Sequence, residues 1–152
     1  MKLLFFHAKD LKIDATSDTR KRRRCQRRIR KRLGSALPEL DGQSVVSSEN
    51  ALLVFVCVEN HDVSMDLRMV CKDILESRVM LGAAEIVIGS FAHLSNDLAD
   101  PSLARRIIDE LASEVLAGHP GTKSFPFGYD KSIDMHVPLH HYNCAFKSYP
   151  KR

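Results

Sequence analysis

The stretch ALLVFVCVE, residues 51–59, is apolar at every position except its last. It is rich in β-branched and aromatic residues, which favour strands, and it lacks the alternation of polar and apolar residues expected when one strand face meets water. A strand without that alternation is typically covered on both faces. We therefore predict that residues 51–59 form the central strand of a sheet.

Two amphipathic helices are predicted by their end signals and by apolar residues at helical spacing. The first has Ser64 as its N-cap and ends before Gly82. The second is marked more clearly, with Asp100 as N-cap, Pro101 at the first helical position and Gly118 at its end. These punctuation residues predict two helices of similar length.

Further strands are predicted on both sides of the central one. Residues 2–8 form the first strand, and residues 83–93 contain a strand that runs into a loop. A turn-rich passage at 119–131 precedes residues 131–149, which can hold two short strands joined near Pro138. This order predicts an α+β fold in which two main helices pack on one side of a mixed β-sheet.

Length and composition predict one domain over residues 1–152. The hydrophobic fraction of 44% and the charged fraction of 28% are ordinary for a globular domain of this size. No apolar run approaches the roughly 18 residues that span a bilayer, so we expect no membrane segment. The start, MKLLFFHAKD, has no secretory signal pattern, which predicts a cytoplasmic protein.

Metal and cofactor chemistry is not suggested. The four cysteines are scattered without a C-x-x-C pair, so we predict neither a disulfide framework nor a zinc knuckle. His136, His140 and His141 lie within six residues, but no spaced cysteine or acidic partner completes a tetrahedral set. We interpret them as surface histidines and predict no metal and no cofactor.

Positive charge is concentrated in one segment. Residues 19–33 hold ten of the 23 lysines and arginines and no acid, although the whole chain has a net charge of only +4. We interpret residues 16–50 as a basic arm or insertion between two strands. A charge block of this kind is typical of a phosphate-binding surface, whereas the alternative is a solvated charged helix. The predicted RNA-binding residues are Arg22, Arg23, Arg24, Arg27, Arg28 and Arg30.

Several uncommon strings together identify a resemblance. They are LLFFHAKD near the start, VFVCVE in the central strand, Phe-Ala-His-Leu-Ser at 91–95, Leu-Ala-Asp-Pro-Ser at 98–102 and Pro-Phe-Gly-Tyr-x-Lys at 126–131. In this order they resemble the N-terminal editing domain of archaeal threonyl-tRNA synthetases, which has a D-aminoacyl-tRNA deacylase-like fold. The resemblance covers roughly residues 1–15 and 50–140, and it excludes the basic arm.

The resemblance implies proofreading: hydrolysis of the ester of L-serine mischarged on threonine tRNA, with threonyl-tRNA spared. Serine lacks one methyl group of threonine, and a pocket built for threonine rejects it by only about 1–3 kcal/mol. A second site that excludes the larger side chain is therefore needed. The implied partners are threonine tRNA, through its 3′ end, and a synthetase catalytic domain in cis or in trans; relatives of this fold also often form homodimers.

The resemblance also implies site residues. Lys131 is the family's motif lysine, a compact cation that can hold a carbonyl or ribose oxygen or order the attacking water. His93 could position water or the terminal adenosine, and the substrate's own 2′-hydroxyl helps to activate water. Ser90 and Ser95 flank His93 without a nucleophile motif, so we do not expect a serine nucleophile. The expected substrate-binding residues are Val58, Ala92, Phe127, Gly128, Tyr129, Asp130, His7 at the pocket floor, and His141.

Two positions depart from the family's pattern. Asp130 stands where the family commonly has a second tyrosine, so a carboxylate neighbours Lys131. His140 and His141 stand where Ala-Glu is common, and His141 must replace the glutamate if that residue binds substrate. Two alternatives remain at this point: a non-catalytic tRNA-binding module of the same fold, and a D-aminoacyl-tRNA deacylase.

Overall fold

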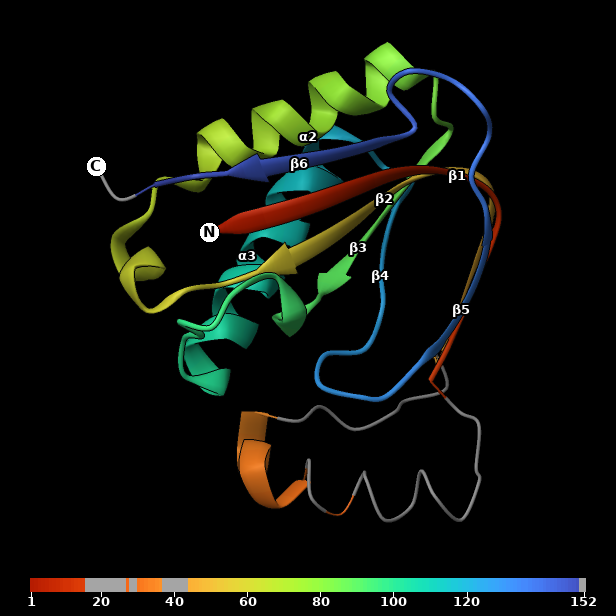
Figure 1. The fold of residues 1–152 in the computed structure, drawn as a ribbon. Helices are drawn as coiled ribbons and strands as arrows, with labels where there is room; N and C mark the ends of the chain where they lie inside the picture. Colours follow the sequence, from red (N-terminus) through yellow and green to blue (C-terminus); the bar gives the residue numbers. More distant parts are fainter. Residues whose placement is uncertain (16–26, 28–29, 37–43, 151–152) are drawn as a thin grey trace.

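The computed structural model describes residues 1–15, 27, 30–36 and 44–150. Its strands are β1 (Lys2–Asp14), β2 (Val45–Cys57), β3 (Glu85–Ser90), β4 (Thr122–Ser124), β5 (Ser132–His136) and β6 (Cys144–Ser148). Its two main α-helices are α2 (Leu67–Leu81) and α3 (Pro101–Gly118), and residues 30–33 are also helical. Short 3-10 turns occur at Gly34–Ala36, Asn60–Ser64 and Ala92–Leu94. Figure 1 shows their arrangement.

The six strands form one mixed sheet with the order β4-β3-β2-β1-β5, and β6 also pairs with β1. β2, β3 and β4 run parallel to one another, whereas β1 is antiparallel to β2, β5 and β6. β6 pairs with the first half of β1 and β5 with the second half. The predicted central position of residues 51–59 is confirmed, because β2 has two strands on each side in this order.

Both faces of β2 are buried over residues 51–57, as the continuous apolar run predicts, whereas residues 45–49 alternate between exposed and buried. Leu52, Val54 and Val56 face the cluster that contains the helices, and Leu53 and Phe55 face a second cluster on the opposite side. Adjacent side chains of a strand point to opposite faces, so one uninterrupted apolar segment supplies both clusters. Helix residues occur in the first cluster alone, which agrees with helices packed on one side of the sheet.

The helix ends differ from prediction at one cap. α2 is capped by Asp66, whose side chain accepts a hydrogen bond from the Arg68 amide, and not by Ser64. Residues 60–64 form a separate 3-10 turn, in which the Asp62 carboxylate accepts a hydrogen bond from the Glu59 amide and also binds the Met1 ammonium at 2.6 Å. The prediction that Gly82 ends this helix is confirmed, since it adopts the left-handed conformation with φ of 62°.

α3 begins as its sequence predicts. Asp100 caps it by accepting a hydrogen bond from the Ser102 amide, and Pro101 occupies the first turn. Gly118 is the last residue of the helix, and His119 caps its end. No helix within the described ranges is long and apolar enough to cross a membrane.

Candidate active site

The candidate site lies where three parallel strands end. β2 ends at Cys57, β3 at Ser90 and β4 at Ser124, and the register Val56↔Ser90 brings the first two ends together. Because parallel strands share a direction, the segments that follow them emerge at one edge of the sheet. Ligands of α/β sheets commonly bind at such an edge. The topology thus brings three motif-bearing segments together.

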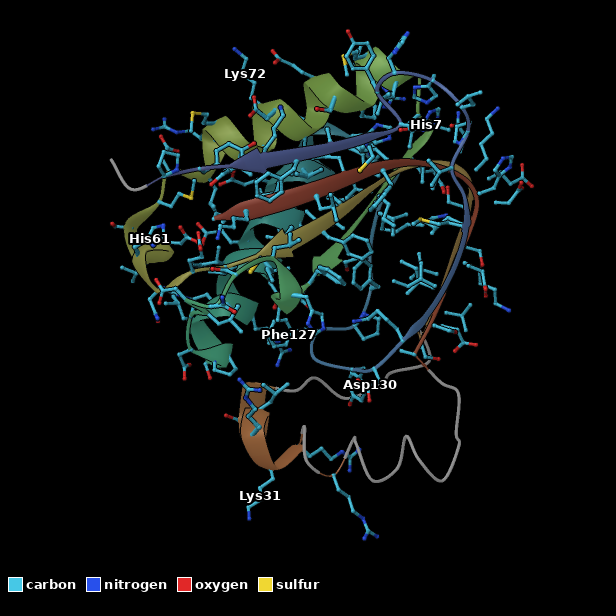
Figure 2. All side chains as sticks on the ribbon, viewed as in Figure 1. His7, Lys31, His61, Lys72, Phe127 and Asp130 are labelled. Carbon is cyan, nitrogen blue, oxygen red and sulfur yellow. The ribbon has the colours of Figure 1, made fainter. Side chains whose placement is uncertain are left out.

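A cavity of about 690 Å³ occupies this edge. Its volume is within the range typical of small-molecule sites, roughly 300–1,000 Å³. The predicted site residues that line it are Val58, Ala92, His93, Phe127, Gly128, Tyr129, Asp130 and Lys131. Eight residues from three distant segments therefore share one cavity, and Phe127 and Asp130 can be located in Figure 2.

Lys131 is a cation of this cavity that is largely shielded from water and lies against an aromatic ring. Its Nζ lies 5.0 Å from the centre of the Phe125 ring, in a cation–π contact. Burial lowers the pKa of Lys131 to about 8, because an ammonium is disfavoured away from water, and the nearby Asp130 carboxylate opposes this change. A lysine with a strongly lowered pKa inside a cavity is a typical functional-site feature.

The turn that precedes Lys131 depends on one glycine. Gly128 has φ of 76°, in the left-handed region where other residues are strained, so it permits the chain to reverse here. Phe125, before the turn, is buried and packs against β3 at Gly89. The sequence Phe-Pro-Phe-Gly-Tyr thus forms a fixed turn that delivers Lys131 to the cavity.

His93 lies in the 3-10 turn that follows β3. Its ring is exposed and meets the edge of the Phe91 ring, with centroids 5.2 Å apart. Phe91 in turn packs on Phe55 of β2, with centroids 4.7 Å apart. The aromatic contacts therefore hold the turn, while the imidazole remains accessible at the cavity.

The serines near His93 have other contacts. Ser95 donates a hydrogen bond to the Glu59 carboxylate at 2.5 Å and accepts one from Lys2 Nζ at 3.2 Å. Ser90 lines the cavity. The Ser95 contacts serve to tie the turn to β1 and to the end of β2.

His7 and His141, which we expected at the site, do not line the cavity. His7 pairs with Leu52 in the middle of β2, whereas the cavity lies at Val56 and beyond. Figure 2 shows His7 far from Phe127 and Asp130. His7 contacts His140 instead, and His141 is exposed. The expectation of a histidine at the pocket floor is therefore corrected.

The sequence did not indicate two parts of the cavity wall. One is the start of α3, where Asp100, Pro101, Ala104 and Ile108 line the cavity. The other is Arg32 with Leu33, from the basic segment. The capped start of α3 directly after the Phe-Ala-His loop was a usable signal for the first, because it places a helix beginning near the end of β3.

Of the predicted RNA-binding residues, Arg27 and Arg30 are exposed, and Arg22, Arg23, Arg24 and Arg28 lie outside the described residues. Within the described ranges, no three side chains of histidine, cysteine, aspartate or glutamate gather as a metal site.

The fold is shared with a known structure. The chain superposes on the c-Myc DNA Unwinding Element Binding Protein with a TM-score of 0.68, at 12% sequence identity and with 99% of each chain covered. With its mixed sheet and two helices, the chain has the predicted α+β, D-aminoacyl-tRNA deacylase-like fold. Fold and cavity thus define an α+β domain with a candidate ligand site at the carboxyl ends of its parallel strands.

The sequence assigns the family. Residues 1–148 match the archaea-specific editing domain of threonyl-tRNA synthetase, and the chain belongs to this family. The resemblance seen in the sequence motifs is thereby confirmed, together with the editing role and the deacylase class that it implied.

Similar sequences occur within threonine–tRNA ligases. The chain is 34% identical to that of Thermofilum pendens over 137 residues, which is 89% of this chain and 20% of the relative. It is 38% identical to that of Hyperthermus butylicus over 115 residues, and 39% identical to that of Pyrobaculum neutrophilum over 106 residues. These cover 69% and 66% of this chain and 18% and 17% of the relatives. The chain thus spans about a fifth of the length of these curated relatives.

Proposed function

We propose that this chain hydrolyses the ester of L-serine mischarged on threonine tRNA and spares threonyl-tRNA. The observation that carries the proposal is the shared cavity of Lys131 and His93 in a member of the synthetase editing family. Had the two side chains faced solvent on different sides of the domain, a catalytic role would have lost its support. Their common cavity favours the enzyme over the non-catalytic binding module.

In the proposed mechanism, the Lys131 ammonium holds an oxygen of the aminoacyl ester or of the ribose and helps to order the attacking water. His93 positions that water or the terminal adenosine. The ribose 2′-hydroxyl of the substrate assists in activating the water, and the ester bond to the ribose oxygen breaks to release serine and uncharged tRNA. An ester requires less activation than an amide, so positioning supplies much of the catalysis.

Selection against threonine is assigned to the apolar wall. Val58 follows β2 directly and is buried, with 3% of its surface exposed. In this proposal its side chain lies beside the serine side chain, where the additional methyl group of threonine would overlap it. Phe127 and Gly128 contact the aminoacyl group through the backbone, and Tyr129 and Asp130 also line the cavity. A methyl-sized exclusion is worth about 1–3 kcal/mol.

The proposed partners follow from the family. Threonine tRNA presents its 3′ end to the cavity, and the catalytic domain of a threonyl-tRNA synthetase acts with this domain in cis or in trans. We further propose that two copies of the chain form a homodimer and that the protein acts in the cytoplasm. Sedimentation at several protein concentrations tests the dimer.

The deciding experiment measures deacylation of seryl-tRNA and threonyl-tRNA, both made on threonine tRNA, by the wild type and Lys131→Ala. We expect rapid serine release, retention of threonine and a loss of at least a hundredfold in the variant. Lys72→Ala is the matched control, because Lys72 is exposed on α2, far from Phe127 (Figure 2). Serine release at the spontaneous rate with retained tRNA binding would favour the binding module instead.

A D-aminoacyl ester on the same tRNA distinguishes the remaining alternative. The proposal requires that the wild type release L-serine faster than a D-amino acid. The opposite preference would assign the chain to chiral proofreading.

A further inference from the structure

The end of the basic segment forms part of the cavity, although it does not belong to the strings that carry the family resemblance. Arg32 and Leu33 line the cavity together with the start of α3. The 3-10 turn that follows, Gly34–Ala36, packs against α3. In Figure 1 this part of the segment, drawn in orange, lies beside the N-terminal end of α3. Residues 32–36 therefore lie at the edge of the cavity, beside α3.

Its cations are available to a ligand. Arg30, Lys31 and Arg32 are all exposed, and no carboxylate of the described residues pairs with them. Asp100 also lines the cavity, but its carboxylate is occupied as the cap of α3. The charge of Asp130 acts on Lys131, on the other wall. Arg30, Lys31 and Arg32 are three adjacent exposed cations, and such a cluster attracts an anionic ligand.

The position of these cations beside the cavity favours the backbone of an RNA 3′ end as the anionic ligand. A cavity of about 690 Å³ accommodates one aminoacylated nucleoside, and Lys131 is where the ester binds in the proposed function. The rest of the single-stranded 3′ end must then leave through the mouth. Leu33 is half-buried and offers an apolar surface there, while Arg32 offers a guanidinium suited to bidentate contact with a phosphate.

We propose that Arg32 and Leu33, which line the cavity, and the neighbouring exposed Arg30 bind the sugar–phosphate backbone of the nucleotides preceding the aminoacylated adenosine. This rests on the proposed function for the direction of the RNA, but it concerns binding and not hydrolysis. The partner is single-stranded RNA at a 3′ end, recognised by its phosphates and not by its base sequence.

The test is a cycle in which two protein charges and two phosphate charges are removed, separately and together. The double variant Arg30→Gln/Arg32→Gln is compared with wild type for binding to an uncharged acceptor-stem RNA with its natural 3′ end. The same RNA with neutral methylphosphonates at the last two linkages serves as the second ligand. We expect the variant to bind the natural RNA about tenfold more weakly than wild type does. The RNA with methylphosphonate linkages should bind the variant and the wild type with the same affinity. The slope of log affinity against log salt should fall by about 1.4, because single-stranded contacts contribute about 0.7 each.

The matched control is Arg68→Gln/Lys72→Gln, which removes two exposed cations from α2. It should leave both affinities and the salt slope unchanged. Equal weakening of both RNAs by the Arg30/Arg32 variant, or no weakening of either, would overturn the proposal and assign these cations to another partner. Thermal unfolding of both variants verifies that they are folded.

Failure of the two proposals can be distinguished. Because the coupling is measured with uncharged RNA, it does not require serine hydrolysis. If the wild type shows the coupling but releases no serine, the proposed RNA contact stands and the proposed deacylase activity is wrong. If it releases serine without the coupling, the deacylase activity stands and the RNA contact is wrong.

Discussion

His7 Nδ1 and His140 Nε2 lie 2.8 Å apart, in a hydrogen bond that joins the loop after β5 to the middle of β1. The neighbouring contacts assign its hydrogen. Asn50 donates to the Gly82 carbonyl, so its oxygen accepts from His7 Nε2 at 2.7 Å. The Tyr142 amide donates to His140 Nδ1, so His140 donates through Nε2 to His7. In this chain of hydrogen bonds each ring donates through Nε2 and accepts through Nδ1.

Replacing His140 should therefore destabilise the protein. His140→Phe leaves the buried Nδ1 of His7 without its donor, and we expect the free energy of unfolding to fall by about 1–3 kcal/mol. Urea denaturation measures it. The neighbouring, exposed His141→Phe is the control and should change stability by less than about 0.5 kcal/mol. Equal effects of the two substitutions would contradict the assigned hydrogen bond.

Deacylation should decline at high pH if Lys131 acts as a cation. Its pKa is lowered to about 8 by burial, so the ammonium predominates below pH 8 and the neutral amine above it. We expect kcat, corrected for spontaneous hydrolysis, to fall about tenfold for each pH unit well above 8. A rate that increases through pH 8 would instead make the neutral amine a general base.

The same pKa predicts how stability depends on pH. Between pH 8 and the ordinary lysine value of 10.5, the unfolded chain binds more protons at this residue than the folded chain. This residue's contribution to the free energy of unfolding should therefore increase with pH in that window. Comparison of wild type with Lys131→Met across the window isolates it, and a decrease with pH would contradict it.

Asp130 should set where the alkaline decline begins. Its carboxylate favours the charged form of Lys131, so Asp130→Asn should lower the pKa of the lysine further. We expect the decline to move to lower pH, with about twofold less activity at pH 8. The control is Asp134→Asn, an exposed residue of β5 outside the cavity, which should leave the profile in place.

Glu59 should contribute stability that acid removes. Burial alone would raise the pKa of this carboxyl, but hydrogen bonds from Ser95, Lys2 and the Met1 ammonium lower it to about 2. Its contribution is complete above pH 4.5 and is lost as pH falls toward 2. Glu59→Gln should reduce the free energy of unfolding at pH 7 by about 3 kcal/mol, as measured with urea.

The matched control is Glu76→Gln, which removes an exposed carboxylate paired with Lys72 at 3.7 Å. It should cost less than about 0.5 kcal/mol. A Glu59→Gln protein as stable as this control would show that the network around the Met1 ammonium contributes little.

Gly89 should affect activity from outside the substrate-binding surface. A Cβ at this position would lie 2.4 Å from the Phe125 ring, and that ring contacts Lys131. Gly89→Ala should reduce stability by about 1–3 kcal/mol and displace Lys131, so that deacylation falls further than stability explains. Gly118→Ala is the control, since its Cβ would meet Leu75 at 2.7 Å, away from the cavity. Unchanged activity in Gly89→Ala would show that the position of the Phe125 ring does not affect the function of Lys131.

Local patterns predicted the elements well where one signal sufficed. The apolar run of β2 required cover on both faces, and Asp100 with Pro101 is a local start signal that α3 follows. Ser64 was misassigned as a cap, because the Met1 ammonium, distant in the sequence, holds Asp62 in a separate turn. A contact across some sixty positions leaves no periodic signal near residue 64.

The motif strings contained eight predicted site residues that line the cavity, but they also contained His7, which does not line it. The register decides that point, since His7 pairs with Leu52 and the cavity begins four positions further along β2. The wall formed by Arg32 and Leu33 was equally unpredictable, because its packing against α3 depends on tertiary contacts of a segment outside the shared motifs.

The pairing of β1 has a consequence for the order in which the chain is made. β1 is synthesised before the other strands of the sheet, yet one of its edges is completed only by β5 and β6, within residues 132–148. At a synthesis rate of about 5–20 residues per second, that edge stays unpaired for on the order of ten seconds while the chain is still on the ribosome. An unpaired strand edge is a surface on which other chains can add. The nascent domain therefore passes through an aggregation-prone interval that the finished sheet closes.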